Sequence, residues 1–298
     1  MNILITGGTG FIGSALTQNL LSQGENVTLF CRNPEMAKKR FGSISTVTDL
    51  NTLNAKHQFD VIINLAGAPI FDKRWTEARK QILRDSRITL THQLIAAIER
   101  MEIKPSLLIS GSAIGIYGDQ GDTILTEDSP AIPDFSQQLC ADWEAAALAA
   151  ETLGVRVGII RTGLVLAHDG GLLQRMLLPF KLGLGGQLGS GKQWMSWIHR
   201  EDWLAIAKAM IDDPTMQGIY NATAPTPAIN LEFTRALAAA ISRPALLPVP
   251  ASLLKLLLGE MSLLVLGSQR VLPERLLEYG FTFKYPTLDR ALLQALKP

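Results

Sequence analysis

The feature that most constrains this 298-residue chain is a glycine-rich segment near its start, in the run MNILITGGTGFIGSAL. Gly8, Gly10 and Gly13 form a GxGxxG spacing, and Gly7, Gly10 and Gly13 also form a GxxGxxG spacing. A β-prone run precedes these glycines, and a helical pattern of apolar residues follows them. Because glycine has no Cβ, such a turn lets a pyrophosphate approach the amides that open the helix. The segment predicts a dinucleotide-binding turn.

The order of the following elements extends this unit into a sheet. The run NVTLFCR has the pattern of a second strand, and helical stretches near residues 77–100 and 137–153 separate the later apolar runs. These runs, which we interpret as buried strands, are residues 60–67, 106–113 and 155–166. Such alternation is typical of parallel α/β folds. We predict an α/β protein with a Rossmann-like doubly wound parallel sheet, in which residues 1–163 form the dinucleotide-binding domain.

The composition of the chain changes after this alternation of strands and helices. Residues 168–194 are glycine-rich and predict irregular structure, and prolines cluster between leucine-rich helical segments from Pro225 onward. We predict that residues 164–298 form a smaller, mostly helical substrate-side lobe, some elements of which return to the sheet. The most apolar tract, residues 253–266, is too short and too interrupted by charge to cross a bilayer. It predicts a buried helix, with a helix on a membrane surface or a partner as the alternative.

Composition and motifs exclude several classes of function. The chain has 28 Lys and Arg against 27 Asp and Glu, so no strong field attracts nucleic acid or a membrane surface. Cys31 and Cys140 lack CxxC spacing, and there is no HExxH motif, so neither a disulfide framework nor a metal site is indicated. No secretory signal pattern opens the chain, and no GxSxG hydrolase motif occurs. We expect a cytoplasmic protein that acts on a small molecule.

The residues after the second predicted strand indicate which dinucleotide is bound. An acidic side chain there would bind the ribose 2′-hydroxyl of NAD and repel a 2′-phosphate. This chain instead has Cys31 and Arg32, followed by Lys38, Lys39 and Arg40. A guanidinium carries a fixed charge and matches the geometry of a phosphate. The sequence therefore predicts NADP, with an ordinary surface arginine as the alternative interpretation of Arg32.

Several motifs resemble those of the extended short-chain dehydrogenase/reductases, the family of sugar-nucleotide epimerases and dehydratases. They are TGGTGFIG at 6–13, NLAG at 64–67, SGSAIGIYG at 110–118, RTGLVL at 161–166 and WIHREDW at 197–203. The segments RWTEARKQILRDSRI, DWEAAA and GSQRVLPERLLEYGF are similar to an atypical, YfcH-like subgroup of NAD-dependent epimerase/dehydratase-like proteins. The resemblance implies a Rossmann domain that binds NADP, a lobe that binds an unidentified small molecule, and a homodimer as an allowed oligomeric state.

The resemblance also implies which residues contact the cofactor. The pyrophosphate lies at the glycine turn, the adenosine phosphate at the end of the second strand, and the nicotinamide near RTGLVL. The implied contacts are Gly7, Thr9, Gly10, Phe11, Ile12, Gly13, Cys31, Arg32, Leu65, Ala66, Gly67, Arg87 and Val165. For Leu65, Ala66 and Val165, packing in the core is the alternative, and it is compatible with backbone contacts to a cofactor.

Ordinary members of this family use a Tyr and a Lys four residues apart on one helix, where the Lys lowers the Tyr pKa. The matching positions here hold Ser136 and Cys140, and no Tyr or Lys occurs between residues 119 and 154. Ser112 fits the family's substrate-orienting serine. The resemblance leaves Tyr117, Cys140 or water to carry the proton. A structural Tyr117 and an inert buried thiol are the alternatives.

These observations predict an NADP-binding oxidoreductase or epimerase that acts on a sugar nucleotide or another small carbonyl or hydroxyl compound held by Ser112. The missing Tyr and Lys leave a catalytically silent NADPH sensor or interaction protein as the alternative. In the glycine-rich loop, Lys192, Trp194 and Trp197 are expected either to close over a ligand or to pack on their own lobe.

Overall fold

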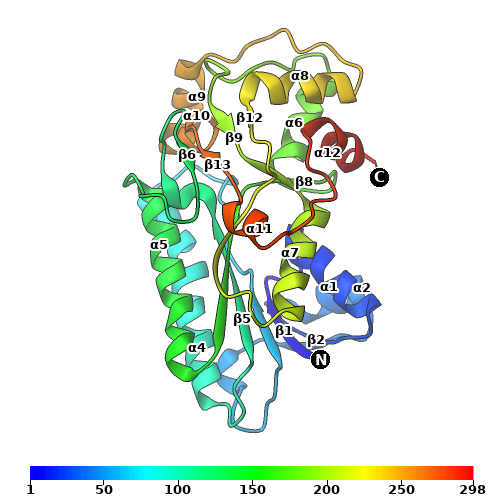
Figure 1. Cartoon of the computed structure of the whole chain (residues 1–298), viewed down its shortest axis with the longest axis vertical. Helices are drawn as coiled ribbons and strands as arrows, with labels where there is room; N and C mark the ends of the chain where they lie inside the picture. Colours follow the sequence, from blue (N-terminus) through cyan, green and yellow to red (C-terminus); the bar gives the residue numbers. More distant parts are fainter. Residues whose placement is uncertain (298) are drawn as a thin grey trace.

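A parallel sheet of seven strands, in the order β11-β7-β5-β4-β1-β2-β3, forms the centre of the computed structural model, which describes residues 1–297 (Figure 1). The strands are β1 (Asn2–Thr6), β2 (Asn26–Phe30), β3 (Ser45–Val47), β4 (Val61–Asn64), β5 (Leu107–Ala113), β7 (Arg156–Thr162) and β11 (Gly218–Ala222). The chain starts at β1, runs outward to β3 and returns to β4 on the other side of β1. This reversal creates the crevice in which doubly wound folds bind ligands, and the predicted fold class is confirmed.

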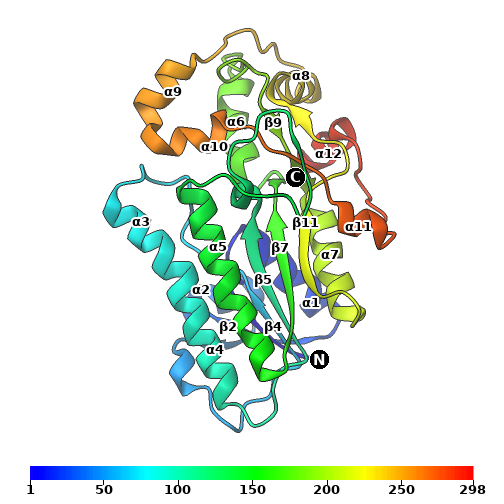
Figure 2. The ribbon, with the colours of Figure 1, turned by 60° about the vertical axis from the view of Figure 1, so that its left-hand side comes forward.

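Helices cover both faces of this sheet, which explains why its strands are almost continuously apolar. Ile3 and Ile5 of β1 face one core with α1 (Phe11–Ser22) and α7 (Arg200–Asp212), whereas Leu4 faces a second core with α4 (Leu90–Arg100) and α5 (Phe135–Leu148). Figures 1 and 2 show these two helical layers on opposite sides of the strands. Two shorter helices, α2 (Pro34–Phe41) and α3 (Glu77–Arg84), lie in the first half of the chain, and a π-helical turn at Asp85–Thr89 joins α3 to α4.

The C-terminal lobe lies beyond the carboxyl ends of the strands, at the top of Figure 1. Its helices are α6 (Gly171–Lys181), α8 (Asn230–Ala240), α9 (Ala251–Leu258), α10 (Leu263–Leu266) and α12 (Leu288–Ala295), while α11 (Glu274–Glu278) packs beside β11 of the sheet. Three short strand pairs accompany them: β8 (Leu164–Leu166) with β10 (Trp197–His199), β9 (Trp194–Met195) with β12 (Ala228–Ile229), and β6 (Ile124–Leu125) with β13 (Arg270–Val271). The lobe has an apolar core of its own, to which α6, α8 and α12 contribute.

Gly163 divides the single strand that the sequence predicts over residues 155–166. A Cβ at this position would lie 2.6 Å from the Ser196 carbonyl oxygen, so the chain passes very close to the β9–β10 segment as it leaves the sheet. The next residues pair with β10 in the lobe, while α7 and β11 later return to the sheet. Gly163 is therefore where the first half of the chain crosses into the lobe.

The irregular structure predicted over residues 168–194 is wrong in part, because α6 occupies Gly171–Lys181. Leu173, Met176 and Phe180 recur at helical spacing and are buried in the core of the lobe. The helix begins against the sheet domain, since a Cβ at Gly170 would lie 2.3 Å from the Phe11 ring. Apolar periodicity was the correct signal here, and the flanking glycines obscured it.

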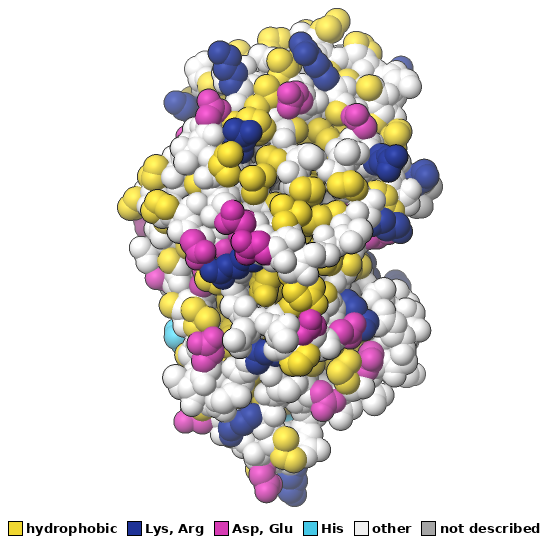
Figure 3. All heavy atoms as spheres, in the orientation of Figure 1, with side chains coloured by type: hydrophobic (Ala, Val, Ile, Leu, Met, Phe, Trp, Pro, Cys, Tyr) yellow, Lys and Arg dark blue, Asp and Glu magenta, His cyan; other side chains and the backbone are white. Residues whose placement is uncertain are grey.

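The single buried helix predicted over residues 253–266 is also wrong. Gly259, with a φ of +60°, ends α9 and starts a 3₁₀ turn that leads into α10. Leu256 and Leu257 of α9 are 72% and 58% exposed. Hydrophobic side chains gather on this lobe and on the junction beneath it (Figure 3). Among residues 1–297, no helix has the length and apolar character needed to cross a membrane.

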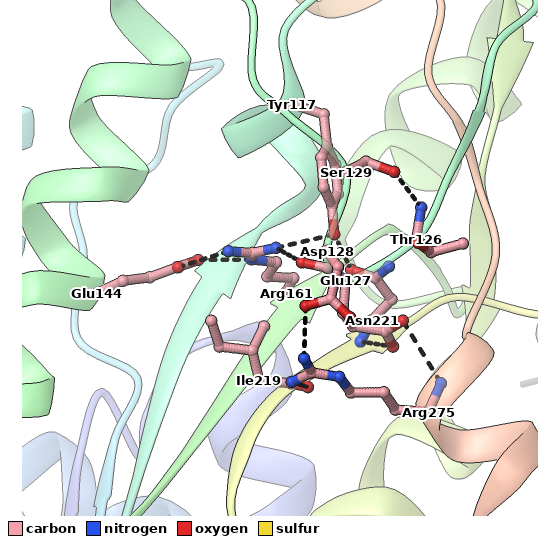
Figure 4. Close-up of polar contacts among 10 residues, drawn as sticks. All are labelled: Tyr117, Thr126, Glu127, Asp128, Ser129, Glu144, Arg161, Ile219, Asn221 and Arg275. Atoms are coloured by element: carbon pink, nitrogen blue, oxygen red, sulfur yellow. Dashed lines mark hydrogen bonds and ion pairs between the residues drawn. The ribbon is translucent and has the colours of Figure 1, made fainter.

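A buried polar network fixes α5 against the sheet (Figure 4). Arg161 of β7 donates two hydrogen bonds of 2.9 Å to the carboxylate of Glu144, one to each oxygen. It donates another, also 2.9 Å, to the Tyr117 hydroxyl, which in turn donates to Asn221 of β11 at 2.7 Å. The backbone amide of Asn221 donates to the side-chain carboxylate of Glu127 at 2.9 Å, and the backbone carbonyl of Glu127 accepts from Arg161. Burial alone would lower the pKa of Arg161, but the bonds and charge of Glu144 raise it.

Removal of the guanidinium from this network should destabilise the protein strongly. Arg161→Met leaves the Glu144 carboxylate buried without its partner, and we expect a loss of about 3–5 kcal/mol in the free energy of unfolding. The measurement is urea denaturation followed by circular dichroism. Arg84→Met is the matched control, because Arg84 pairs with Asp142 on the exposed side of the same helix; this pair should contribute less than about 1 kcal/mol.

The double variant Arg161→Met/Glu144→Leu gives an internal check. Because it removes both charges, it should recover part of the lost stability. An Arg161→Met protein that is as stable as the wild type would contradict the role of the pair.

Candidate cofactor and substrate site

The turn between β1 and α1 has the geometry of a phosphate cradle. Gly7 has a φ of +71°, a backbone conformation that favours glycine. A Cβ at Gly13 would lie 2.2 Å from the Gly7 carbonyl oxygen, and one at Gly8 would lie 2.4 Å from a methyl group of Leu29. Glycine is therefore required at these positions to bring α1 close against the turn.

The first turn of α1 has unused hydrogen-bonding capacity. Gly10 occupies the N-cap position and supplies no side-chain acceptor, and in the described chain no acidic residue lies in this first turn. The opening amides of the helix, from Phe11 to Gly13, therefore have no side-chain partner. The positive end of the helix dipole adds to their attraction for an anion. These features fit the pyrophosphate of a dinucleotide.

A cavity of about 540 Å³ lies between this turn and the C-terminal lobe. Both halves of the chain line it, since β5, α5 and the glycine turn face α10 and the β8–β10 region. The predicted site residues that line the cavity are Gly7, Gly10, Phe11, Ile12, Gly13, Leu65, Gly67, Arg87, Ser112 and Cys140. The structure therefore brings eight of the thirteen predicted cofactor residues and two of the three predicted catalytic residues into one space.

Three of the predicted cofactor residues, in the glycine turn and directly after β2, do not line this cavity. Cys31 is buried just after β2, and Arg32 next to it is exposed. The carbonyl oxygen of Thr9 accepts a 3.3 Å hydrogen bond from Arg40 of α2. Arg32 and Arg40 therefore place positive charge beside the glycine turn, where the sequence lacks the acidic residue that NAD-specific proteins use.

Three further predicted residues also do not line the cavity. The Ala66 amide donates to the Thr6 hydroxyl at 3.1 Å, and Val165 is buried in β8. Tyr117 is fully buried, and its hydroxyl hydrogen is directed to Asn221. This geometry favours the structural interpretation of Tyr117 and does not bring its hydroxyl to the site.

Arg87 carries a positive charge inside the cavity. In the described chain its guanidinium donates to the carbonyls of Leu83 and Ala68 and to Ser86, and not to a carboxylate. It rests against the backbone at Gly67, where a Cβ would lie 2.8 Å from the guanidinium carbon. Burial lowers the pKa of Arg87 to about 10, so the group stays protonated at neutral pH. This charge can be paired with an anionic ligand.

Ser112, at the carboxyl end of β5, presents its oxygen to the cavity. Its hydroxyl donates to Oε1 of Glu144 at 2.6 Å, the same carboxylate that Arg161 holds. Because the hydrogen points toward Glu144, the lone pairs of Oγ remain available to a ligand hydroxyl. Ser112 is therefore oriented by the network described above.

Ser136 and Cys140 replace the usual Tyr and Lys, and both line the cavity on α5. Burial and the negative charge of Glu144 raise the pKa of Cys140 to about 11, against the opposing effect of Arg87. Cys140 is therefore a protonated thiol at neutral pH. The site has a weak acid close to Ser112 and no strong base among the side chains of residues 119–154.

The glycine-rich loop places only one of its three predicted residues at the cavity. Trp194 lines it, and its indole donates to Asp122 at 2.8 Å. Trp197 is fully buried in the core of the lobe, and Lys192 is exposed and does not line the cavity.

The sequence analysis missed most of the substrate-side wall. Leu263, Leu264 and Val265 line the cavity from the apolar tract, and Ile70 and Phe71 line it from the segment after β4. The unusual apolarity of residues 253–266 is the sequence signal for this wall, but the same apolarity also predicts a helix buried in a core.

Comparison with known proteins identifies the family. The family described as NAD dependent epimerase/dehydratase family matches residues 3–222, and a domain of unknown function matches residues 249–295. The chain is 38% identical to the Arabidopsis thaliana protein named epimerase family protein SDR39U1 homolog, chloroplastic, over 98% of this chain and 86% of that protein. It is 39% identical to the epimerase family protein YfhF of Bacillus subtilis, over 99% and 98% of the two chains.

Solved structures agree with this assignment. The human epimerase family protein SDR39U1, crystallised with NADPH, is 34% identical and superposes with a TM-score of 0.90 over 99% of both chains. A nucleoside-diphosphate sugar epimerase from Corynebacterium glutamicum is 32% identical, with a TM-score of 0.78 over 99% of this chain and 58% of that one. A Bacillus cereus UDP-glucuronic acid 4-epimerase, 20% identical, shares the fold. The match across the sheet, the glycine turn and the lobe shows that this chain belongs to the NAD dependent epimerase/dehydratase family.

Proposed function

We propose that this protein is an NADPH-dependent oxidoreductase that transfers a hydride between the cofactor and a small carbonyl or hydroxyl compound. The observation that carries the proposal is that one cavity holds both the glycine turn at α1 and the pair Ser112 and Cys140. A phosphate cradle and proton-carrying side chains in the same space are the requirements for hydride transfer coupled to proton transfer.

The choice of NADP over NAD rests on charge. Arg32 is exposed directly after β2, where it is free to reach a 2′-phosphate, and Arg40 lies close to the turn. The human relative that superposes over the whole chain was crystallised with NADPH, which agrees with this choice. A guanidinium gains more from a phosphate than from a hydroxyl, because the hydrogen bonds are charge-assisted.

We assign roles in carbonyl reduction to the side chains of the cavity. NADPH, when bound, supplies a hydride to the carbonyl carbon. Ser112 is held by Glu144, to which it donates its hydrogen, and its lone pairs accept a hydrogen bond from the hydroxyl of the alcohol that forms. Cys140 gives its thiol proton to the carbonyl oxygen, which as an alkoxide is far more basic than a thiolate. The thiolate that remains is stabilised by the charge of Arg87 until water restores the proton.

A second candidate function is a silent NADPH-binding sensor or interaction protein. The observation that favours it is the replacement of the usual Tyr and Lys by Ser136 and Cys140. Both candidates require cofactor binding, and only the first requires turnover. Experiments that separate binding from turnover therefore decide between them.

Cofactor preference gives the first test. Calorimetric titration should show tighter binding of NADPH than of NADH, and Arg32→Ala should weaken NADPH binding about tenfold or more while leaving NADH binding unchanged. Arg243→Ala, on an exposed loop of the lobe, is the matched control and should alter neither affinity. Equal affinities of the wild type for the two cofactors would rule out the NADP assignment.

The proton-carrying role of Cys140 gives the second test. Cys140→Ala should lower kcat about 100-fold without weakening NADPH binding, and Ser112→Ala should also reduce turnover at unchanged NADPH affinity. Gln138→Ala is the matched control, because Gln138 lies on the same helix but is exposed and outside the cavity. The assay is NADPH oxidation at 340 nm.

The pH profile of the same reaction is a further check. Because the thiol is the proton donor and its pKa is about 11, kcat should stay constant from neutral pH upward and fall only as pH approaches 11. A loss of activity centred near pH 8 in the wild type would show that another group donates the proton.

A further inference from the structure

We infer that the substrate is an uncharged, largely apolar carbonyl compound, and not a nucleotide sugar. This inference rests on the proposed function, because it concerns the substrate half of the same cavity. The evidence for it is the charge of the residues that line that half and the apolar character of its walls.

Among the described residues, the lining of the cavity contains a single cation, which lies between the cofactor turn and Cys140. Of the described residues that line the cavity, Arg87 is the only Lys or Arg, and it rests against Gly67 beside the cofactor turn. The other charged lining residues are Asp119 and Asp134. The electrostatic character of the substrate half is therefore neutral to negative.

Both of these carboxylates are fixed in place by backbone amides. Asp119 accepts from the amides of Gly121 and Ser268, at 3.3 and 3.1 Å. Asp134 is the N-cap of α5 and accepts from Gln137 at 2.7 Å. Their partners are neutral, so their negative charge is not cancelled by an ion pair and acts on any ligand in the cavity.

Three basic side chains of the lobe lie outside the lining of the cavity. Lys192 is exposed and does not line the cavity. Arg270 stacks on the ring of Trp194, with 4.4 Å between the guanidinium carbon and the ring centroid, and also does not line it. Arg175, on α6, is paired with Asp72.

A nucleotide sugar is a poor fit for such a space. Its diphosphate carries two negative charges, and sites for phosphate normally supply Arg, Lys or helix N-terminal amides. Here the diphosphate would leave water to lie near Asp119 and Asp134, and among the described lining residues Arg87, beside the cofactor turn, is the one cation. Binding of this substrate class is therefore strongly disfavoured.

The walls of the substrate half favour an apolar molecule instead. Leu263, Leu264 and Val265 face the cavity from α10, and Ile70 and Phe71 face it from the segment after β4. Met195, Leu188, Leu164, Leu172 and Trp194 extend this apolar lining. An uncharged ring or chain that reaches these walls would be removed from water, a favourable transfer that grows with the apolar area buried.

The α10 wall is held firmly enough to act as a binding surface. Leu264 packs in one cluster with Ile70, Phe71 and the buried Met261. Arg74 donates to the Leu256 carbonyl at 2.8 Å, and Lys80 forms a 2.7 Å ion pair with Glu260. These contacts fix residues 256–264 against the segment after β4, so both apolar walls are positioned together.

The test compares a charged and an uncharged probe on the full chain loaded with cofactor. UDP-glucose and 2-naphthaldehyde are each titrated by calorimetry into the NADP⁺-bound protein, and each is assayed for NADPH oxidation at 340 nm. We expect 2-naphthaldehyde to bind and to be reduced. We expect UDP-glucose neither to bind nor to inhibit that reaction at millimolar concentration.

Variants of the wall make the test specific. Val265→Thr keeps the shape of the side chain but adds a hydroxyl, and Leu264→Asn adds a larger polar group; each should raise KM for 2-naphthaldehyde several-fold with a smaller change in kcat. Leu256→Asn is the matched control, since this leucine is 72% exposed and lies outside the cavity. It should leave KM unchanged.

The outcomes separate this inference from the proposed function. Failure to bind NADPH would overturn the proposed function. Normal NADPH binding together with micromolar binding of UDP-glucose would overturn the inference about the substrate alone. Failure of 2-naphthaldehyde and of other uncharged aromatic or alicyclic carbonyls to bind the NADP⁺-loaded protein would also overturn it.

Discussion

The buried pair between Glu144 and Arg161 is the interaction on which the rest of the site depends. Its carboxylate orients Ser112 at the end of β5, and its guanidinium reaches Tyr117 and the Glu127 carbonyl. The same chain of hydrogen bonds continues through Asn221 to β11, a strand contributed by the second half of the sequence. One ion pair therefore fixes the reactive end of the cavity to the sheet and to the segment that returns from the lobe. Such a pair is costly to break because each charge is buried.

The sequence was sufficient to predict the parallel sheet and the glycine turn, because both depend on local patterns. Apolar strands covered on both faces and glycines at fixed spacing leave signals that need no knowledge of distant residues. The sequence predicted a domain boundary after residue 163 but not the division of the strand over 155–166 at Gly163, because that division depends on the carbonyl of Ser196, far along the chain. The position of Leu263 and Leu264 on a cavity wall was not predicted for a similar reason, because the apolarity of a segment is the same whether it faces a core or a cavity. For Tyr117, only the structure showed that its hydroxyl points to Asn221.

The absence of the usual Tyr and Lys and the apolar wall are consistent with the same chemistry. The ordinary pair provides a phenol made more acidic by a nearby cation. The proton donor that we propose here is a thiol whose pKa is raised by burial, in a cavity that has one cation among its described lining residues and largely apolar walls. A site of this kind can protonate an alkoxide but is poorly suited to remove a proton from a hydroxyl at neutral pH. The geometry therefore favours reduction of a carbonyl over the reversible oxidation that an epimerase needs.

We propose that the cavity supports hydride transfer from NADPH to a carbonyl carbon. The most direct measurement uses NADPH in which both hydrogens at C4 of the nicotinamide are deuterium, with 2-naphthaldehyde as the acceptor and mass spectrometry and NMR of the alcohol product. The account predicts one deuterium on the carbinol carbon, with a single configuration at that centre. An alcohol product without deuterium, or no product from a protein that binds NADPH tightly, would contradict it.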